Sequence, residues 1–180
     1  MVILQTGTSD IPLTANGEAL IERLGSKAVG SGKFIDPNLL GKVLVSPRIR
    51  AQRTCQILFT NTDIKPTIET EQLVREWTYG DYEGLYLHEI VEQRQAHGLQ
   101  PEHTDWNIWI DGCEGGESAQ DLTNRADAVI DQVKNFHNEW IHKSGRNLDD
   151  QGGDILVICV LEYSKEMKST RLGAMNLGLL

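Results

Sequence analysis

The sequence predicts an α/β sandwich with a largely parallel sheet. Short β-rich runs, KVLVS at 42–46 and DILVICVL at 154–161, are separated by segments in which apolar residues recur at helical spacing. Strands separated by helices favour a parallel sheet that is covered by helices. DILVICVL does not alternate between apolar and polar residues, which is typical of a strand buried on both faces. A chain of 180 residues is long enough for one compact domain or a large fragment of one.

The first helix is predicted to follow Thr14, whose hydroxyl can cap it, and to end at Gly30 and Gly32. Its apolar residues at helical spacing are Leu20, Ile21, Leu24 and Ala28.

KVLVS is the next strand, and Ser46 and Pro47 after it are predicted to be the N-cap and first residue of a second helix. That helix would bury one face, formed by Ala51, Cys55 and Leu58.

The second half of the chain continues the alternation. Residues 66–73 are predicted to form a strand and residues 85–96 a helix, which Gly98 and Pro101 close. A long helix begins at Ser118, with Asp121 three residues later as a variant of the capping box. Its apolar stripe consists of Leu122, Ala126, Val129, Val133, Phe136 and Trp140.

The charge balance limits the partners. A net charge of −9 argues against general binding to nucleic acid or to anionic membranes, because both need a basic face. A locally basic pocket for a small anionic substrate is still compatible with it. Three widely spaced cysteines indicate reduced thiols in a cytoplasmic protein, and the longest apolar run, 155–161, is far below the roughly 20 residues of a membrane span.

Three segments are candidates for chemistry, because ligands of open α/β sheets bind beyond the carboxyl ends of strands. SPRIRAQRT places Arg48, Arg50 and Arg53 in the first turns of a helix, where they form either a phosphate site or a solvated basic face. In REWTYGDYEG, aromatic neighbours of Glu76 either desolvate it for use as a general acid or form a plug beside solvated carboxylates.

The third segment, GCEGGES, is either an anion-facing nest or a turn that enters the long helix. The five histidines have no metal-ligand spacing and no Ser or Asp relay partner in the sequence, so each is interpreted as structural or solvated.

Taken in order, TGTSDIPLTANGE, VLVSPRIRAQRT, REWTYGDYEG, GCEGGES and DILVI resemble the histidine phosphatase superfamily, the phosphoglycerate mutase-like group. The matching stretches run from about Thr6 to Ile158. REWTYGDYEG and WNIWIDGC are most similar to the fungal sedoheptulose-1,7-bisphosphatase branch of this family.

The resemblance implies a three-layer α/β/α sandwich and a phosphorylated small-molecule substrate. It also implies metal-independent hydrolysis or transfer of phosphate through a phosphohistidine, with no cofactor. Carried over residue by residue, it makes Arg50 a phosphate clamp and Glu76 the proton donor to the leaving oxygen. It places Thr6 and Gly7 in a substrate-contacting loop, with Tyr79 as a neighbour of the substrate.

The sequence departs from the family pattern at both pocket histidines. The Arg-His-Gly triplet that supplies the nucleophile does not occur, and only residues 1–5 precede the first match. Cys159 and Val160 stand where the second histidine and its glycine are expected. Apolar neighbours raise the pKa of a cysteine thiol, so Cys159 is a poor substitute nucleophile.

These departures predict a single, incomplete domain over residues 1–180, without its first central strand and with a divergent segment at 161–180. Residues 1–4 are expected to supply at most a stump of that strand. Three hypotheses stay open: an active sugar-phosphate phosphatase, a catalytically silent relative that binds phosphorylated metabolites or a partner protein, and a non-functional fragment.

Overall fold

Three parallel strands form the sheet of this protein. The computed structural model describes residues 4–99, 105–144 and 152–159. The strands are β1 (Leu40–Val45), β2 (Ile68–Thr70) and β3 (Asp154–Ile158), in the spatial order β2-β1-β3. Both pairings are parallel. The prediction of a parallel sheet is therefore confirmed.

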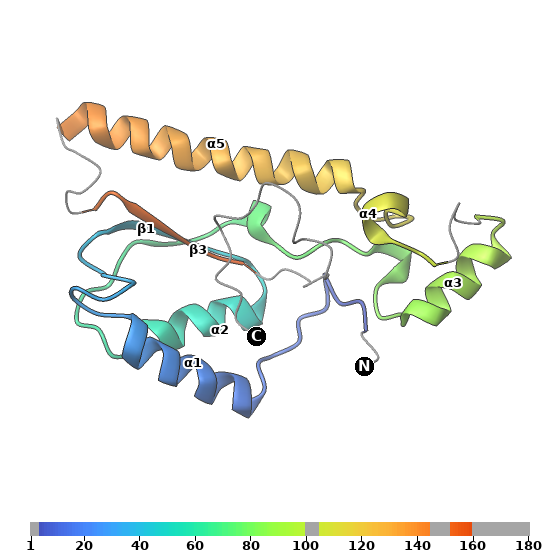
Figure 1. Cartoon of the computed structure of the whole chain (residues 1–180), viewed down its shortest axis with the longest axis horizontal. Helices are drawn as coiled ribbons and strands as arrows, with labels where there is room; N and C mark the ends of the chain where they lie inside the picture. The colour runs from blue at the N-terminus through green and yellow to red at the C-terminus, as the bar shows by residue number, and fades with distance from the viewer. Residues whose placement is uncertain (1–3, 100–104, 145–151, 160–180) are drawn as a thin grey trace.

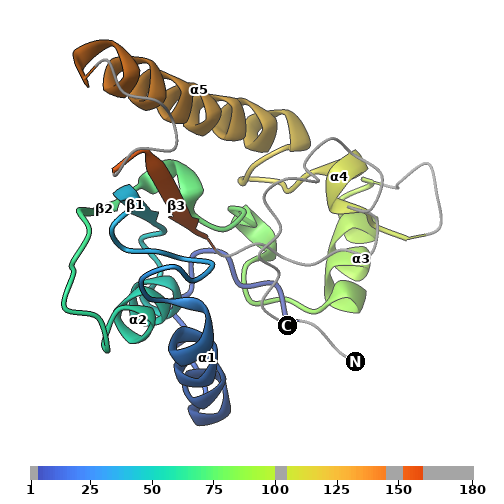
Figure 2. The same ribbon diagram turned by 60° about the vertical axis from the view of Figure 1, so that its left-hand side comes forward.

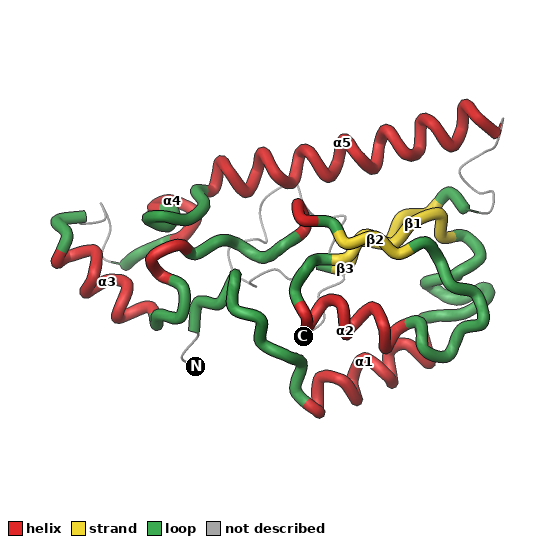
Figure 3. The backbone as a smooth tube through the Cα atoms, turned by 180° about the vertical axis from the view of Figure 1, so that it is seen from behind, coloured by secondary structure: helices red, strands yellow, loops and turns green. Residues whose placement is uncertain are grey.

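Helices cover both faces of the sheet. Helix α5 (Ala119–Ser144) runs along one face, and α1 (Ala15–Ala28) and α2 (Ile49–Leu58) lie on the other (Figure 1). The view from behind shows the strands between these two helical layers (Figure 3). The fold is thus the three-layer α/β/α sandwich.

The predicted cap of α1 is present. The Thr14 hydroxyl accepts a hydrogen bond from the Gly17 amide at 3.0 Å, and the helix ends at Ala28. Ile21 is buried and Leu24 packs against the core, whereas Leu20 is exposed. Of the predicted apolar residues, Leu20 therefore lies off the buried face.

Helix α2 begins later than predicted. Its first residue is Ile49 and not Pro47, because Ser46 is fully buried and its amide donates to the Ile158 carbonyl at 2.8 Å. The N-cap residue, Arg48, makes no side-chain cap. Instead, the carboxylate of Asp10 accepts from the Ile49 amide at 2.8 Å, so the cap comes from a residue 39 positions earlier. The predicted buried face, Ala51, Cys55 and Leu58, is confirmed.

The strand buried on both faces is β1 and not β3. β1 is paired on both sides, and Val43 and Val45 have no exposed surface. Within the described residues β3 pairs with β1 alone, and residues 155–157 are only half-buried. The apolar run identified a sheet strand correctly, but its degree of burial depends on pairing that the run does not specify.

A second group of short elements lies beside the sandwich, as the rotated view shows (Figure 2). β2 belongs to the sheet and occupies only three of the eight residues predicted for it. The second group begins after it, with two 3₁₀ turns, Gln72–Val74 and Gly80–Tyr82. Helices α3 (Leu87–Ala96) and α4 (Ile108–Asp111) complete the group. Its aromatic cluster contains Trp77, Tyr79, Tyr82, Ile90, Trp106 and Cys113.

The capping box of α5 is confirmed. The Ser118 amide donates to the Asp121 carboxylate at 2.9 Å, and the Asp121 amide donates to the Ser118 hydroxyl at 3.2 Å.

The described part of the chain contains no helix that is both long and apolar enough to cross a membrane.

The described part of the N-terminal segment, which begins at Leu4, is not a strand of the sheet. Leu4 forms an antiparallel bridge with Tyr86, and the Gln5 amide donates to the Leu85 carbonyl at 3.0 Å. The expected stump of a central strand is therefore wrong at its one described residue, Leu4. Residues 1–3, Pro101, His103 and the predicted divergent segment at 161–180 lie outside the described residues.

Candidate functional site

The predicted site residues gather at the carboxyl ends of β1 and β3. The start of α2 follows β1 directly, and the hydrogen bond between the Ser46 amide and the Ile158 carbonyl joins the ends of the two strands. The segment at 5–10 lies over this edge and contacts both α2 and residues 77–83. This is the edge at which open α/β sheets bind their ligands.

Arg50, the predicted phosphate clamp, contacts the loop at 6–9, which contains the predicted substrate-contacting residues Thr6 and Gly7. Its Nη2 donates to the Thr6 carbonyl and its Nη1 to the Ser9 carbonyl, both at 3.3 Å. Arg48 adds a third bond, from Nη1 to the Thr8 carbonyl at 2.9 Å. Two guanidinium groups therefore lie on the carbonyl side of this loop.

The amide side of the same loop holds a carboxylate. The amides of Gly7, Thr8 and Ser9 all donate to Glu83, at 3.0, 3.1 and 2.8 Å. Successive amides that point to one anion form a nest of the kind that binds phosphate in other proteins. In this chain Glu83 occupies the nest.

The pKa of Glu83 lies below its ordinary value of 4.5. Burial by itself raises this pKa, but hydrogen bonds from the Ser9 backbone and side chain and from the Thr8 and Gly7 amides outweigh it. Glu83 is therefore ionised at neutral pH and holds the loop as an anion.

Gly7 packs directly on the segment that carries Tyr79. A Cβ placed on Gly7 would lie 2.9 Å from Cδ2 of Tyr79 and would overlap the carbonyl of Trp77. Glycine is therefore required at this close approach. The structure thus brings Thr6, Gly7, Arg50 and Tyr79 together, although Tyr79 itself is only 2% exposed.

Glu76 is buried at the same edge, with 5% of its surface exposed. Its Oε1 accepts a hydrogen bond from the Trp77 amide at 2.8 Å. The aromatic plug expected around this segment is present, but the alternative of a solvated carboxylate at Glu76 is wrong. Its proton-donor role stays a prediction.

A buried ionic network anchors the Glu76 segment to α5. Glu117 accepts from Arg125 Nε and Arg75 Nη2 through one oxygen, at 2.9 and 2.8 Å, and from Arg125 Nη2 and the Thr78 amide through the other, both at 2.9 Å. Arg125 also donates to the carbonyls of Leu73 and Arg75. The backbone on both sides of Glu76 is therefore fixed by Glu117 and Arg125.

Contacts in two segments bear on the alternatives that the sequence leaves open. Arg53 does not join the site, because it pairs with Glu18 of α1 at 2.7 Å. In GCEGGES the Gly116 amide donates to the Cys113 carbonyl and the Glu117 amide to the Thr78 carbonyl, at 3.0 and 2.8 Å. The first amide closes a turn and the second holds the Glu76 segment, so both amides have protein acceptors, which favours the interpretation of this segment as a turn that enters the long helix.

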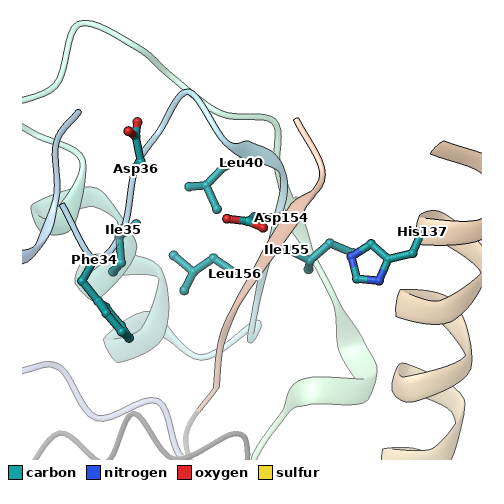
Figure 4. Close-up of a pocket in the computed structure, with 8 residues that line it drawn as sticks. All are labelled: Phe34, Ile35, Asp36, Leu40, His137, Asp154, Ile155 and Leu156. Carbon is teal, nitrogen blue, oxygen red and sulfur yellow. The ribbon is translucent and has the colours of Figure 1, made fainter. Parts of the chain in front are cut away.

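A cavity of about 270 Å³ lies elsewhere, along β3 at the start of the strands (Figure 4). Leu40 and Asp154, the first residues of β1 and β3, line it, and His137 extends from α5 toward Ile155. The cavity is thus at the opposite end of the sheet from Arg50.

The other described histidines lie on helices or at a helix end: His88 is on α3, His97 is at its C-cap and His142 is on α5.

The thiols and possible metal ligands add no reactive group to the site. The pKa of the Cys159 thiol is raised, first by desolvation and second by the negative charge of Glu76. Burial raises the pKa of Cys55 to about 11. Among the residues that the structure describes, no three His, Cys, Asp or Glu side chains are grouped to hold a metal ion.

Sequence reasoning missed four residues of this region: Asp10, Glu83, Glu117 and Arg125. Three of them stand inside stretches that resemble the family, yet no local pattern shows that their side chains bind backbone amides or arginines far away in sequence. The sequence marks Arg48 only as one arginine of a basic helix turn.

Acidification is expected to destabilise this region. Glu83 and Glu117 both have folded-state pKa values below the ordinary 4.5, since hydrogen bonds and arginine charges outweigh the effect of burial, which by itself raises the pKa. The unfolded chain binds these protons first as the pH falls, so their stabilisation is present above pH 4.5 and is lost as the pH drops through the folded values. Urea unfolding at about pH 7 and about pH 3 measures the loss.

The Glu83→Gln variant is the control for this prediction. It cannot titrate at this position, so its unfolding midpoint should fall less between the two pH values than that of the wild type. An equal fall in both proteins would show that Glu83 contributes nothing to the pH dependence.

Comparison with known proteins identifies a family model and two relatives that match most of this chain. The family model described as histidine phosphatase superfamily (branch 1) matches residues 3–141. A sedoheptulose 1,7-bisphosphatase of Saccharomyces cerevisiae is 36% identical over 156 residues, which are 84% of this chain and 55% of the relative. An acid phosphatase of Mycobacterium tuberculosis is 31% identical over 125 residues, 69% of this chain and 52% of the relative. The chain spans about half the length of these relatives.

Solved structures agree on the fold. A protein of Mycobacterium tuberculosis superposes with a TM-score of 0.58 at 25% identity. The superposition covers 87% of this chain and 64% of the mycobacterial chain. A phosphoglycerate mutase of Bacillus anthracis superposes with a TM-score of 0.59 at 21% identity. The superposition covers 87% of this chain and 66% of the mutase. With the family model matched over residues 3–141, the chain belongs to the histidine phosphatase superfamily.

Proposed function

We propose that this chain binds phosphorylated sugars through Arg50 and the loop at 6–9 and does not by itself form a phosphohistidine. The observation that carries the proposal is the contact between Arg50 and this loop at the carboxyl edge of the sheet. Two of the five N–H groups of the guanidinium donate to loop carbonyls, and the others are sufficient for a bidentate phosphate contact.

The backbone anion sites of this region support arginine as the phosphate ligand. The N-terminus of α2 is capped by Asp10, and the amide nest of the loop is filled by Glu83. These two backbone sites therefore hold carboxylates of the chain. Arg48 and Arg50 are, among the residues that the structure describes, guanidinium groups at this edge that can neutralise a phosphate.

The absence of phosphohistidine chemistry is inferred from the sequence. The 180 residues contain no Arg-His-Gly triplet, and the described histidines lie on α3 and α5 and not after a strand. Cys159, the described thiol that follows β3, is exposed, but its raised pKa disfavours the thiolate, so it is not an activated phosphoryl acceptor.

The name of the yeast relative supports a sugar bisphosphate as the ligand. A cytoplasmic location is part of the same proposal and is supported by the free cysteines.

The second candidate is an active sugar-phosphate phosphatase. The burial of Glu76 at the same edge favours it, because a desolvated carboxyl group is suited to donate a proton to a leaving oxygen.

The test is calorimetric titration with sedoheptulose 1,7-bisphosphate, beside an assay of phosphate release. We expect binding without release. Removing a charge-assisted hydrogen-bond donor costs about 1.5–3 kcal/mol, so Arg50→Ala should weaken binding about 10- to 100-fold. Arg53→Ala is the matched control, since Arg53 is on the same helix but pairs with Glu18, and its binding should equal that of the wild type.

Each other outcome has a defined meaning. Phosphate release that Arg50→Ala abolishes would favour the phosphatase. No binding by the wild type would refute the proposal.

A further inference from the structure

We propose that Glu83 is the positioning residue for Arg50, acting through the peptide units of the loop at 6–9 and not by direct contact. This inference rests on the proposed function, because it concerns the same phosphate-binding arginine. It starts from the fact that Glu83 and the two arginines lie on opposite sides of one short backbone segment.

One peptide unit links Glu83 to Arg50. Its N–H, on Gly7, donates to Glu83 Oε2 at 3.0 Å. Its C=O, on Thr6, accepts from Arg50 Nη2 at 3.3 Å. Because a peptide unit is planar, any rotation that breaks the first bond also turns the carbonyl away from Arg50.

A second peptide unit repeats the arrangement with Arg48. Its N–H, on Ser9, donates to Glu83 Oε1 at 2.8 Å, and its C=O, on Thr8, accepts from Arg48 Nη1 at 2.9 Å. In each unit the negative charge faces the N–H and the positive charge faces the C=O. Such a chain of hydrogen bonds polarises every member in the favourable direction.

The orientation of Arg50 depends on this loop. In the described part of the chain, both hydrogen bonds of its side chain go to the loop carbonyls of Thr6 and Ser9. Ser9 is itself held by Glu83 through its amide. A loop released from Glu83 therefore loses the restraint on the Thr6 carbonyl and on the amide before the Ser9 carbonyl, so Arg50 is less firmly oriented and must be ordered in part by the ligand itself.

Glu83→Gln is the main variant. It keeps the shape of the side chain but places an NH₂ donor among three amide donors, so the nest loses half of its acceptors. Loss of a residue that orients a ligand-binding group costs about tenfold in affinity. A residue that only satisfies buried amides would instead lower stability and leave the affinity of the folded protein unchanged.

The first measurement needs no ligand. Phenylglyoxal modifies accessible guanidinium groups, and peptide mass spectrometry gives the rate at each arginine. We expect Arg50 to react about threefold faster or more in Glu83→Gln. The rate at Arg53, which pairs with Glu18, should not change. An unchanged rate at Arg50 overturns the proposal.

The second measurement is a double-mutant cycle with the sugar bisphosphate of the binding test above. Glu83→Gln should weaken binding about tenfold when Arg50 is present and less than about twofold in the Arg50→Lys background. An equal loss in both backgrounds shows that Glu83 does not act through Arg50 and refutes the proposal.

A third variant covers the case in which Glu83→Gln does not fold. Glu83→Ala vacates the nest, and added acetate should fill it and restore the wild-type phenylglyoxal rate at Arg50, whereas chloride at equal ionic strength should not. A folded Glu83→Ala protein that acetate leaves unchanged counts against the proposal. If the wild type binds no sugar bisphosphate, the proposed function fails, while the phenylglyoxal rates still decide the role of Glu83.

Discussion

Replacing Glu117 with alanine is expected to destabilise the fold by about 3–5 kcal/mol, a large part of the roughly 5–15 kcal/mol that a domain has. Glu117 is 9% exposed, and both of its oxygens are used by Arg125, with Arg75 and the Thr78 amide as further donors. Alanine leaves the Arg125 guanidinium, which is 8% exposed, as a buried charge without its carboxylate. The desolvation of that charge is then uncompensated, and this is the physical reason for the large effect.

Urea unfolding at neutral pH measures this loss, and Glu18→Ala is the matched control. Glu18 also binds an arginine through both oxygens, at 2.7 and 3.0 Å from Arg53, but the pair is solvent-exposed and joins two helices at the surface. Exposed pairs contribute little because water screens them, so this variant should unfold near the wild-type midpoint. Equal midpoints for the two variants would contradict the role assigned to the Glu117 network.

Gly80→Ala is expected to produce the second large effect, a loss of about 4 kcal/mol or more. Gly80 has φ +56°, in the left-handed region, and a Cβ there would overlap the carbonyl of Glu114 and the backbone of Gly115 and Gly116. These are main-chain atoms of the turn that enters α5, so no side chain can move aside to make room. The turn and the Glu76 segment would have to separate.

Gly84→Ala separates the cost of a left-handed alanine from the cost of the close backbone contact at Gly80. Gly84 has φ +79° and belongs to the same segment, but a Cβ added to it meets no atom within 4 Å. This variant bears only the conformational cost of a left-handed alanine, about 1–2 kcal/mol. Thermal unfolding of both variants gives the comparison. If Gly80→Ala were no less stable than Gly84→Ala, the close backbone approach at Gly80 would not matter.

These two predictions concern the same part of the molecule. Glu117 and Gly80 both join the segment at 75–84 to the start of α5. That segment carries Glu76 and Tyr79 toward the carboxyl edge and, through Glu83, fixes the loop that contacts Arg50. Stability at this junction and ligand binding at Arg50 are therefore expected to decline together when the junction is disturbed.

Local patterns in the sequence were sufficient to predict the helical and sheet layers of the fold. Apolar spacing and capping residues predicted α1 and α5 with their Thr14 and Ser118 caps, because both signals lie within a few residues of each other. The predicted start of α2 was wrong, since Asp10, and not Ser46, supplies its cap. The predicted burial of β3 on both faces was wrong for a related reason: an apolar run does not specify how many neighbouring strands a strand has.

By itself, the sequence determined the α/β class and the family, and it marked Arg50, Glu76 and the loop at 6–9 as candidates, because each lies in a short continuous stretch. Only the tertiary structure decided what those residues contact. Glu83 binds amides 74–76 positions away, Asp10 caps a helix 39 positions away, and Glu117 reaches the Thr78 amide 39 positions away. Contacts at such separations arise when packed elements bring distant segments together, and a carboxylate in a sequence carries no sign of which backbone amide or arginine it will meet.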